Sequence, residues 1–429
     1  MLAPPPAAPR SIGSWDDAIA LIRANAPDYL SGAEGIRRAE AQRQIAMAAV
    51  LPSATAQVGY THQFLSPLRA TLAGIGGNPN ANPPQVVPYP LSTPAEDNVS
   101  LSASVTWAAL NPRGLYGVGT ANRQIEETQL AFQDQRRQIA FAAVDAMLAT
   151  LSAQRVAELN RVGLRAAIDR LTLTKARLAY GQAPAVDVDR ASQDVAAARE
   201  TLVQGDESLR QAREALGVLL GSPVALAPPP GVDLASFATA VSRTCRMNDD
   251  LERRPDVLAA RKRVEIADRN VNDARLMFSP TVSLSTTVED DTTPILGPNA
   301  TWSATALLNV PLYDGGARYG TLRDRRAALE QARQDLEKAR LNAIVSSAQA
   351  KRAVAVAEQT HATALEQRDL AARVDERTRD GYAKGLGTSL DLVVSGQALR
   401  QAEINLAILD FQVEDARAHA VLVNAECVY

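Results

Sequence analysis

The stretch VSLSASVTW, residues 99–107, alternates apolar and polar side chains without a break. Val99, Val105 and Trp107 lie on the apolar side, and the intervening positions from 100 to 106 are serine or threonine. A repeat of two is the period of a β-strand with one apolar face. Each such strand is about 8 to 13 residues long, as a tilted strand that crosses a bilayer must be, and its uncharged polar side is typical of a water-filled barrel. Three further stretches alternate in the same way, at about residues 53–64, 281–288 and 301–312.

A single strand of this kind fits one face of a soluble sandwich equally well. A soluble sheet must cover its apolar face, however, and the other elements that the sequence predicts are helices far longer than a strand. Lipid can cover that face instead, but open sheet edges are not tolerated in hydrocarbon. Four strands cannot close a barrel, so we expect several chains to pool their strands.

Two stretches without proline, residues 113–180 and 316–382, predict very long helices. Each helix would extend roughly 100 Å at 1.5 Å per residue. Shorter helices are expected at about 185–220 and 390–426, after turns that contain glycine. A soluble coiled coil is the alternative for such helices taken alone, but it gives no reason for the strands.

The pattern occurs twice along the chain. Pro27-Asp28 and Pro255-Asp256 each open a helical stretch that leads to a proline and then to an alternating strand, which indicates an internal duplication. The first repeat is predicted at 1–221, with strands at about 53–64 and 99–110 and a helical hairpin at about 113–221. A linker is predicted at 222–250. The second repeat is predicted at 251–429, with strands at about 281–288 and 301–312 and a helical hairpin at about 316–426.

Composition and motifs argue against several classes of protein. The net charge of −3 is unlike that of a general nucleic-acid binder. No phosphate loop, serine elbow or metal-ligand spacing occurs, and His62, His361 and His419 are isolated in the sequence. We therefore expect no catalytic residues, no cofactor and no metal site.

The sequence predicts no transmembrane helix, because no run of about 18 uncharged apolar residues occurs. The opening MLAPPP, residues 1–6, lacks a charged start followed by an apolar core. The protein is therefore either cytoplasmic or has lost a signal peptide.

These features together resemble the TolC family of outer-membrane channel proteins over nearly the full length of the chain. The resemblance implies an α+β membrane protein: a homotrimer whose strands, four from each chain, form one twelve-stranded β-barrel that continues into a long antiparallel α-helical barrel in the periplasm. It rests on the doubled strand-loop-strand-long-helix order and on four segments: Arg253-Arg254-Pro255-Asp256-Val257, Ser279-Pro280, Leu312-Tyr313-Asp314-Gly315-Gly316, and Tyr382-Ala383-Lys384-Gly385 followed by Asp391.

The function that the resemblance implies is that of an exit duct in the outer membrane of a Gram-negative cell. The duct would belong to a tripartite pump that exports drugs or other small molecules. Its partners would be outer-membrane lipid, a periplasmic adaptor (membrane fusion) protein and an inner-membrane pump of the RND or ABC type, and nucleic acid would not be among them. The alternatives are the duct of a type I protein secretion system and a soluble structural coiled-coil protein.

The resemblance also implies a gate at the periplasmic helical turns. Tyr382 matches the tyrosine of an inter-chain network, Asp187 its aspartate partner, and Asp391 the first aspartate ring. Gly387 stands where some members place a gating arginine, and Val394 where they place a second aspartate. An aspartate just after a turn can instead cap the helix. The tips expected to contact the adaptor are Gly181, Gln182, Ala183, Gly385, Leu386 and Thr388.

The chain has two cysteines. Cys245 falls in the predicted linker, and Cys427 follows the last predicted helix. A periplasmic location would allow the two thiols to oxidise. The sequence is compatible with a disulfide between the two cysteines and equally with two free thiols.

Overall fold

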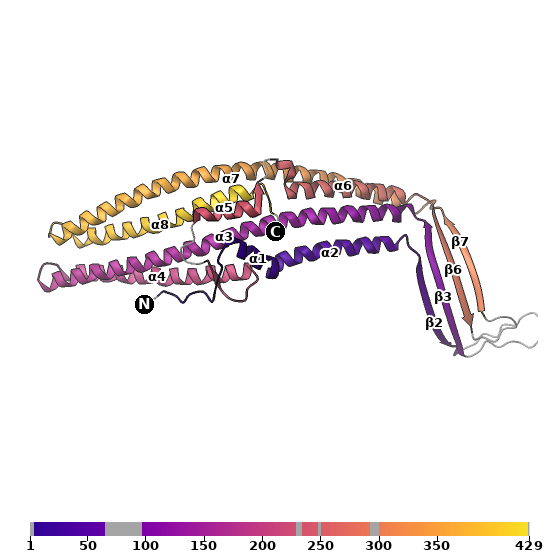
Figure 1. Cartoon of the computed structure of the whole chain (residues 1–429), viewed down its shortest axis with the longest axis horizontal. Coiled ribbons are helices and arrows are strands. Elements are labelled where there is room, and N and C mark those ends of the chain that lie inside the picture. Colours follow the sequence, from indigo (N-terminus) through magenta and orange to yellow (C-terminus); the bar gives the residue numbers. More distant parts are fainter. Residues whose placement is uncertain (1–3, 65–96, 229–233, 248–249, 292–299, 428) are drawn as a thin grey trace, which may run out of the picture. The chain divides into compact units, whose positions relative to one another are not determined.

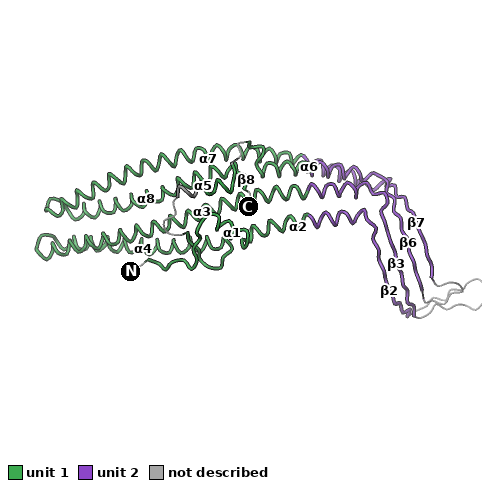
Figure 2. The backbone as a smooth tube through the Cα atoms, viewed as in Figure 1, with its two compact units in different colours: residues 1–39, 124–265, 330–429 green, residues 40–123, 266–329 purple. Residues whose placement is uncertain are grey.

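The computed structural model describes residues 4–64, 97–228, 234–247, 250–291, 300–427 and 429 (Figure 1). The chain divides into two compact units (Figure 2). Unit 1 contains residues 1–39, 124–265 and 330–429, and unit 2 contains residues 40–123 and 266–329. Each unit draws on both predicted repeats, so the repeat boundaries remain a prediction.

Unit 2 contains a four-stranded antiparallel sheet in the order β2-β3-β6-β7. The predicted alternation runs across the strands in register: Ala103 is opposite Val288, and Val288 is opposite Trp302. The last strand ends at Asn309, three residues before the predicted end, because Pro311 cannot donate a hydrogen bond to a ladder. The strands are β2 (Ser53–His62), β3 (Asp97–Leu110), β6 (Thr281–Asp291) and β7 (Ala300–Asn309).

The two strand exits in unit 2 cap the helices that follow them. Asn111 accepts a hydrogen bond from the Gly114 amide at 2.9 Å and donates its own amide to the carbonyl of Ala49 at 3.1 Å. In the second copy, Asp314 accepts hydrogen bonds from the amides of Gly316 and Arg318 at 3.2 and 3.0 Å. These caps satisfy amides that the first helical turn leaves unpaired.

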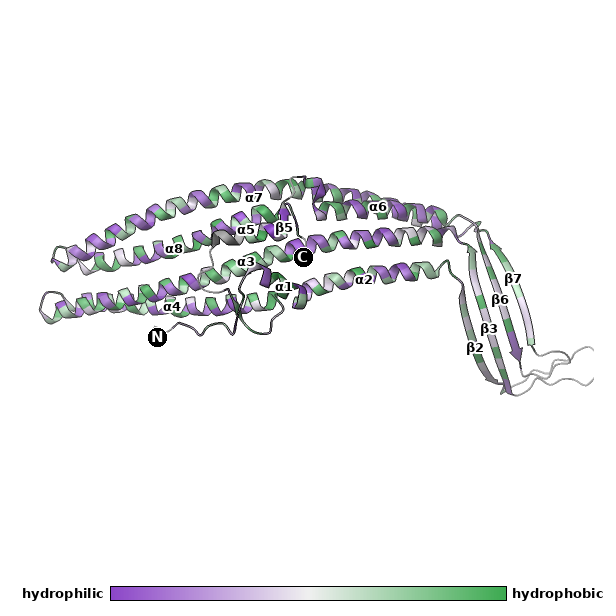
Figure 3. Ribbon diagram, in the orientation of Figure 1, coloured by the Kyte–Doolittle hydropathy of each residue, from purple (hydrophilic) through white to green (hydrophobic). Residues whose placement is uncertain are grey.

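Unit 1 contains two helical hairpins and the short elements of the linker. The long helices match their predicted bounds within one residue, and hydrophilic and hydrophobic residues intermingle along both (Figure 3). The helices are α1 (Trp15–Asn25), α2 (Pro27–Ala48), α3 (Pro112–Ala179), α4 (Ala185–Leu219), α5 (Leu234–Thr244), α6 (Pro255–Leu276), α7 (Ala317–Ala383) and α8 (Ser389–Leu422), with a 3-10 helix η1 (Leu251–Arg253). The two ends of each of α2, α3, α6 and α7 are assigned to different units.

The last hairpin was predicted to run to about residue 426, and this end is wrong. Helix α8 ends at Leu422, and β8 (Ala425–Cys427) pairs antiparallel with β5 (Cys245–Met247). A second short sheet pairs β1 (Arg10–Ser11) with β4 (Leu226–Ala227) in parallel. The chain leaves the helix here because a strand of the linker offers its backbone groups as partners.

Cys245 and Cys427 lie directly opposite each other in the β5–β8 pair and are joined in a disulfide. Both side chains are fully buried in the main hydrophobic core of unit 1. Trp15 of α1 donates its indole N–H to the Thr244 hydroxyl at 3.0 Å beside them. The linker is therefore part of a packed core.

One helix among the described residues, α3, is long and apolar enough to cross a membrane by length and composition. The sequence predicted no such helix. Ile139, Val144 and Met147 of α3 are buried in the core of unit 1. Part of this apolar stretch is therefore buried within the protein.

Candidate gate at the helical tips

The two hairpin tips have the same backbone. Gly181 and Gly385 adopt φ values of +69° and +79°, which only glycine adopts readily. The residue after each glycine donates its amide to a carbonyl five residues earlier, at 2.8 Å from Gln182 and 2.9 Å from Leu386. This hydrogen bond, present at both tips, closes the last turn of α3 and of α7. The chain can then reverse, so that α4 and α8 run antiparallel to the helices before them.

The residues predicted to contact an adaptor lie mostly on the surface of these turns. Five of them are exposed, and Ala183 is half-buried. Leu386 is 84% exposed, and Val394, one turn into α8, is also exposed. Single exposed apolar side chains are common on protein surfaces, so the adaptor contact at these turns stays a prediction.

Asp391 caps helix α8. Its carboxylate accepts hydrogen bonds from the hydroxyl and the amide of Thr388, at 2.6 and 3.3 Å, and its amide donates to the Thr388 hydroxyl at 3.2 Å. These bonds lower the pKa of Asp391, so the exposed carboxylate stays ionised. The capping alternative is therefore correct for this structure, and the fixed charge at the tip is compatible with a role in the pore.

Asp187 occupies the corresponding first turn of α4 and is buried. The guanidinium of Arg190, one turn along the same helix, approaches its carboxylate at 3.4 Å. Among the described residues, the structure shows no hydrogen bond between Asp187 and Tyr382. Their pairing between chains stays a prediction.

Tyr382 contacts Arg177, a residue that the sequence reasoning missed. The Arg177 guanidinium lies over the tyrosine ring, 4.4 Å from its centroid, and donates a hydrogen bond to the Tyr382 carbonyl. Arg177 belongs to the last turn of α3, where a basic side chain is ordinarily read as a partner of the helix dipole. The contact joins the tips of the two hairpins within one chain.

The Tyr382 side chain is buried within its own chain, and its hydroxyl has no hydrogen-bond partner among the described residues. A hydrogen bond from this hydroxyl to another chain therefore requires the ring to move outward. Gly387 packs against the same residue, since an added Cβ would lie 3.3 Å from the Tyr382 nitrogen. A Cβ at position 387 would fit only if this backbone shifted by a few tenths of an ångström.

A buried polar cluster holds the two hairpins together farther along the bundle. Arg170 of α3 and Asp194 of α4 form an ion pair of 2.7 Å in which both side chains are buried. Gln397 of α8 donates to the other oxygen of Asp194 at 3.0 Å. Gly396 allows this approach, because a Cβ there would lie 2.5 Å from the Arg170 guanidinium. No sequence pattern indicated the cluster, since its members are separated by up to about 200 residues.

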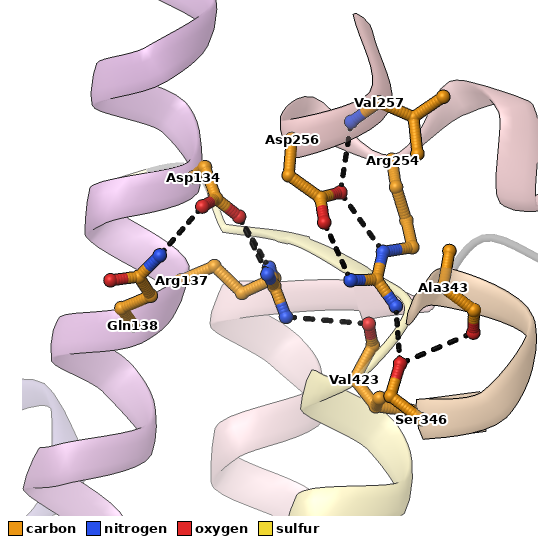
Figure 4. A network of polar contacts seen from close by, with 9 residues as sticks. All are labelled: Asp134, Arg137, Gln138, Arg254, Asp256, Val257, Ala343, Ser346 and Val423. Carbon is orange, nitrogen blue, oxygen red and sulfur yellow. Dashed lines mark hydrogen bonds and ion pairs between the residues drawn. The ribbon is translucent and has the colours of Figure 1, made fainter. Parts of the chain in front are cut away.

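The motif that opens the second repeat takes part in a network of polar contacts (Figure 4). Arg254 is buried and makes a two-pronged contact with Asp256, at 3.0 and 2.7 Å, while its third nitrogen donates to Ser346 of α7 at 2.8 Å. Burial alone would raise the pKa of Asp256, but the hydrogen bond and charge of Arg254 outweigh burial and lower it.

Arg137 of α3 makes a similar connection beside this pair (Figure 4). It contacts Asp134 at 2.6 Å and donates to the carbonyl of Val423, just past α8, at 3.4 Å. The two arginines therefore fix the ends of helices that are distant in the sequence.

Comparison with known proteins bears on this arrangement. Residues 247–419 match the family model described as outer membrane efflux protein. The toluene efflux pump outer membrane protein TtgC of Pseudomonas putida is 28% identical over 250 residues, which cover 56% of this chain and 51% of the relative. The match thus spans about half the length of this curated relative.

Solved structures match over a larger share of the chain. CusC has a TM-score of 0.77 at 16% identity and covers 99% of this chain and 96% of its own. VceC from Vibrio cholerae has a TM-score of 0.74 at 17% identity, with 95% of each chain covered. This chain therefore shares its fold with CusC and VceC.

Proposed function

We propose, from the premise that this chain resembles the TolC family in sequence and in fold, that it is the outer-membrane exit duct of a tripartite efflux pump. Three copies would form the duct, which would open at the periplasmic helical tips. The family is one of transport components, so no enzymatic activity is expected.

The observation that carries this proposal is the exposure of the four-stranded sheet among the described residues of unit 2. Every residue of β7 is exposed, and so are all but one of the residues of β2, the two strands at the sheet edges. Val58 on β2 and Trp302 on β7 are 74% and 80% exposed. An uncovered apolar face and unpaired edges are unstable in water. Lipid can cover the apolar face, and strands of neighbouring copies can form hydrogen bonds with the edge strands.

A homotrimer is the assembly that we propose, with a twelve-stranded barrel built from four strands per chain. The register of the sheet supports a barrel with one polar side, because Ser104 pairs with Thr287 and Thr287 with Ser303. This polar row would face the water-filled interior. The duplicated organisation, with repeats at 1–221 and 251–429 around the linker 222–250, belongs to the same proposal.

The gate is proposed at the tips that hold Asp391, Val394, Asp187, Tyr382 and Gly387. Three copies of an ionised Asp391 would form a ring of negative charge that favours cations. The exposed turns of both hairpins would receive a periplasmic adaptor, which would connect the duct to an inner-membrane pump of the RND or ABC type. The relative named as part of a toluene efflux pump supports small-molecule export over protein secretion by a type I system.

Purification from membranes tests the proposal. In detergent the protein should elute as one species with three times the chain mass of 45.7 kDa, and it should form cation-selective pores in planar bilayers. Removal of detergent should aggregate it. A monomer that stays soluble without detergent would instead support the structural coiled-coil alternative.

A further inference from the structure

A group of metal-ligating side chains lies between α3 and α8 of unit 1, away from the helical tips. Asp415 and His419 are one turn apart on α8, so they project from the same face of the helix. Asp145 of α3 lies opposite them. One ligand atom from each residue lies within 4.8 Å of the other two.

The histidine is oriented toward both carboxylates. Its Nε2 atom is hydrogen-bonded to Asp145 Oδ1 and lies 3.6 Å from Asp415 Oδ1. The edge-on ring of Phe141, with centroids 4.8 Å apart, supports the imidazole from the side of the core. The nitrogen is therefore held on the side where the two carboxylates converge.

The group has access from outside and room for additional ligands. Asp145 and Asp415, but not His419, line an open groove of about 260 Å³, together with Ser152, Gln412 and apolar residues of α3 and α8. A water molecule takes up about 30 Å³, so the groove admits an ion with coordinated water. All three side chains remain partly exposed.

From this geometry we propose that Asp145, Asp415 and His419 form a binding site for a divalent first-row transition ion, of which Zn²⁺ is the probe. Imidazole nitrogen and carboxylate oxygen are ordinary ligands of such ions, at about 2.0–2.2 Å. Neighbouring ligands of a tetrahedral ion are then about 3.4 Å apart. The three ligand atoms lie within 4.8 Å of one another, and they reach that spacing when each side chain shifts by less than an ångström. Three protein ligands leave positions for water.

The sequence predicted no metal site, because each histidine is isolated in the chain. Isolation along the chain excludes only a metal site that is built from neighbouring residues of one segment. Asp145 is about 270 residues from His419 and reaches it through the packing of α3 against α8. Among the described residues, no other three His, Cys, Asp or Glu side chains converge in this way.

His361 offers a matched control. Its Nε2 atom lies 2.7 Å from Asp410 Oδ1, between α7 and α8, and its side chain is as exposed as that of His419, at 33% against 34%. It has a single carboxylate partner within the described parts of the chain. A histidine–carboxylate pair of the same exposure is therefore present without the third ligand.

The test is Zn²⁺ binding by the full chain in detergent, after treatment with a chelator, measured by calorimetric titration and by the rise in Tm that a bound ligand produces. The background variant Asp391→Asn removes the charged ring proposed at the tips. We expect one Zn²⁺ per chain. Since losing even an outer partner of a metal ligand commonly weakens binding about 10- to 100-fold, His419→Gln and Asp415→Asn should each weaken it at least about tenfold, and His361→Gln should not.

Asp145→Asn is the second variant, because Asp145 is the most exposed of the three and its loss should leave folding intact. Circular dichroism identifies any variant that fails to fold. With Co²⁺ as the probe, the visible absorption bands of a bound ion should disappear in Asp145→Asn and persist in His361→Gln. The absence of stoichiometric Zn²⁺ binding, or its equal loss in His361→Gln, would overturn the assignment.

Discussion

Replacing Arg177 with glutamine is expected to shift the gate toward its open state. The guanidinium is partly buried, stacks on the Tyr382 ring and donates to the Tyr382 carbonyl. A cation–π contact at such a site contributes about 0.5–1 kcal/mol, and a hydrogen bond from a charged group about 1.5–3 kcal/mol. Because Arg177 is half-exposed, we take the lower part of the combined range, about 2–3 kcal/mol.

This contact exists only in the closed state if the two hairpin tips separate on opening. Its loss then changes the ratio of open to closed channels by the full amount. At a factor of ten for each 1.4 kcal/mol, about 2–3 kcal/mol is a change of about 30- to 150-fold. Single-channel recordings in planar bilayers measure this ratio directly as open probability.

Two further variants control for other effects. Arg165→Gln removes an exposed arginine from the same helix and should leave open probability unchanged. Arg177→Lys keeps the charge but loses the planar stacking and should give an intermediate value. If Arg177→Gln folds normally and opens no more often than the wild type, the contact does not hold the closed state and the reasoning is refuted.

The remaining predictions concern the sheet, the charged ring and the disulfide. Val105→Arg should impair membrane insertion, at about 2–4 kcal/mol near the midplane, whereas Ser104→Arg on the polar face should insert normally and alter conductance. Equal insertion of the two in a membrane fractionation assay would show that the faces are misassigned. Asp391→Asn should weaken cation selectivity and block by divalent ions, measured as reversal potential and current in salt gradients, and unchanged selectivity would remove Asp391 from the pore. Cys245→Ser should lower the free energy of unfolding by up to about 5 kcal/mol in the chain-entropy model for a separation of 182 residues, and alkylatable thiols at both positions in protein taken from cells would contradict the disulfide.

The strands and long helices follow from the sequence because their signals are local and repeated. The alternation from Val99 to Trp107 sets both the strand and its two faces, and glycines such as Gly181 and Gly385 are required by the backbone of the turns. The bounds of the helices follow from the proline and glycine residues at their ends. Pro112, for example, occupies the first position of α3.

Contacts between helices were beyond this kind of reasoning. Arg177 reaches Tyr382 across 205 residues, and Arg170 reaches Asp194 inside the bundle. A buried arginine has no distinctive spacing in the sequence, since a solvated arginine on a helix face gives the same pattern. The strand at Ala425 was missed for a related reason, because its partner at Met247 belongs to the linker.

Strands β2 and β7 lie at the two edges of the sheet within the described part of the chain, and this has a consequence for biogenesis. In the proposed trimer, the hydrogen bonds of these edges form only between copies, so a single chain has no complete barrel to fold into. Its stability is then a property of the assembly and depends on protomer concentration, as for other obligate oligomers. Before assembly the open edges favour pairing with any other strand, which makes this stage prone to aggregation. The step at which β2 of one copy would meet β7 of the next is therefore the step of assembly most exposed to aggregation.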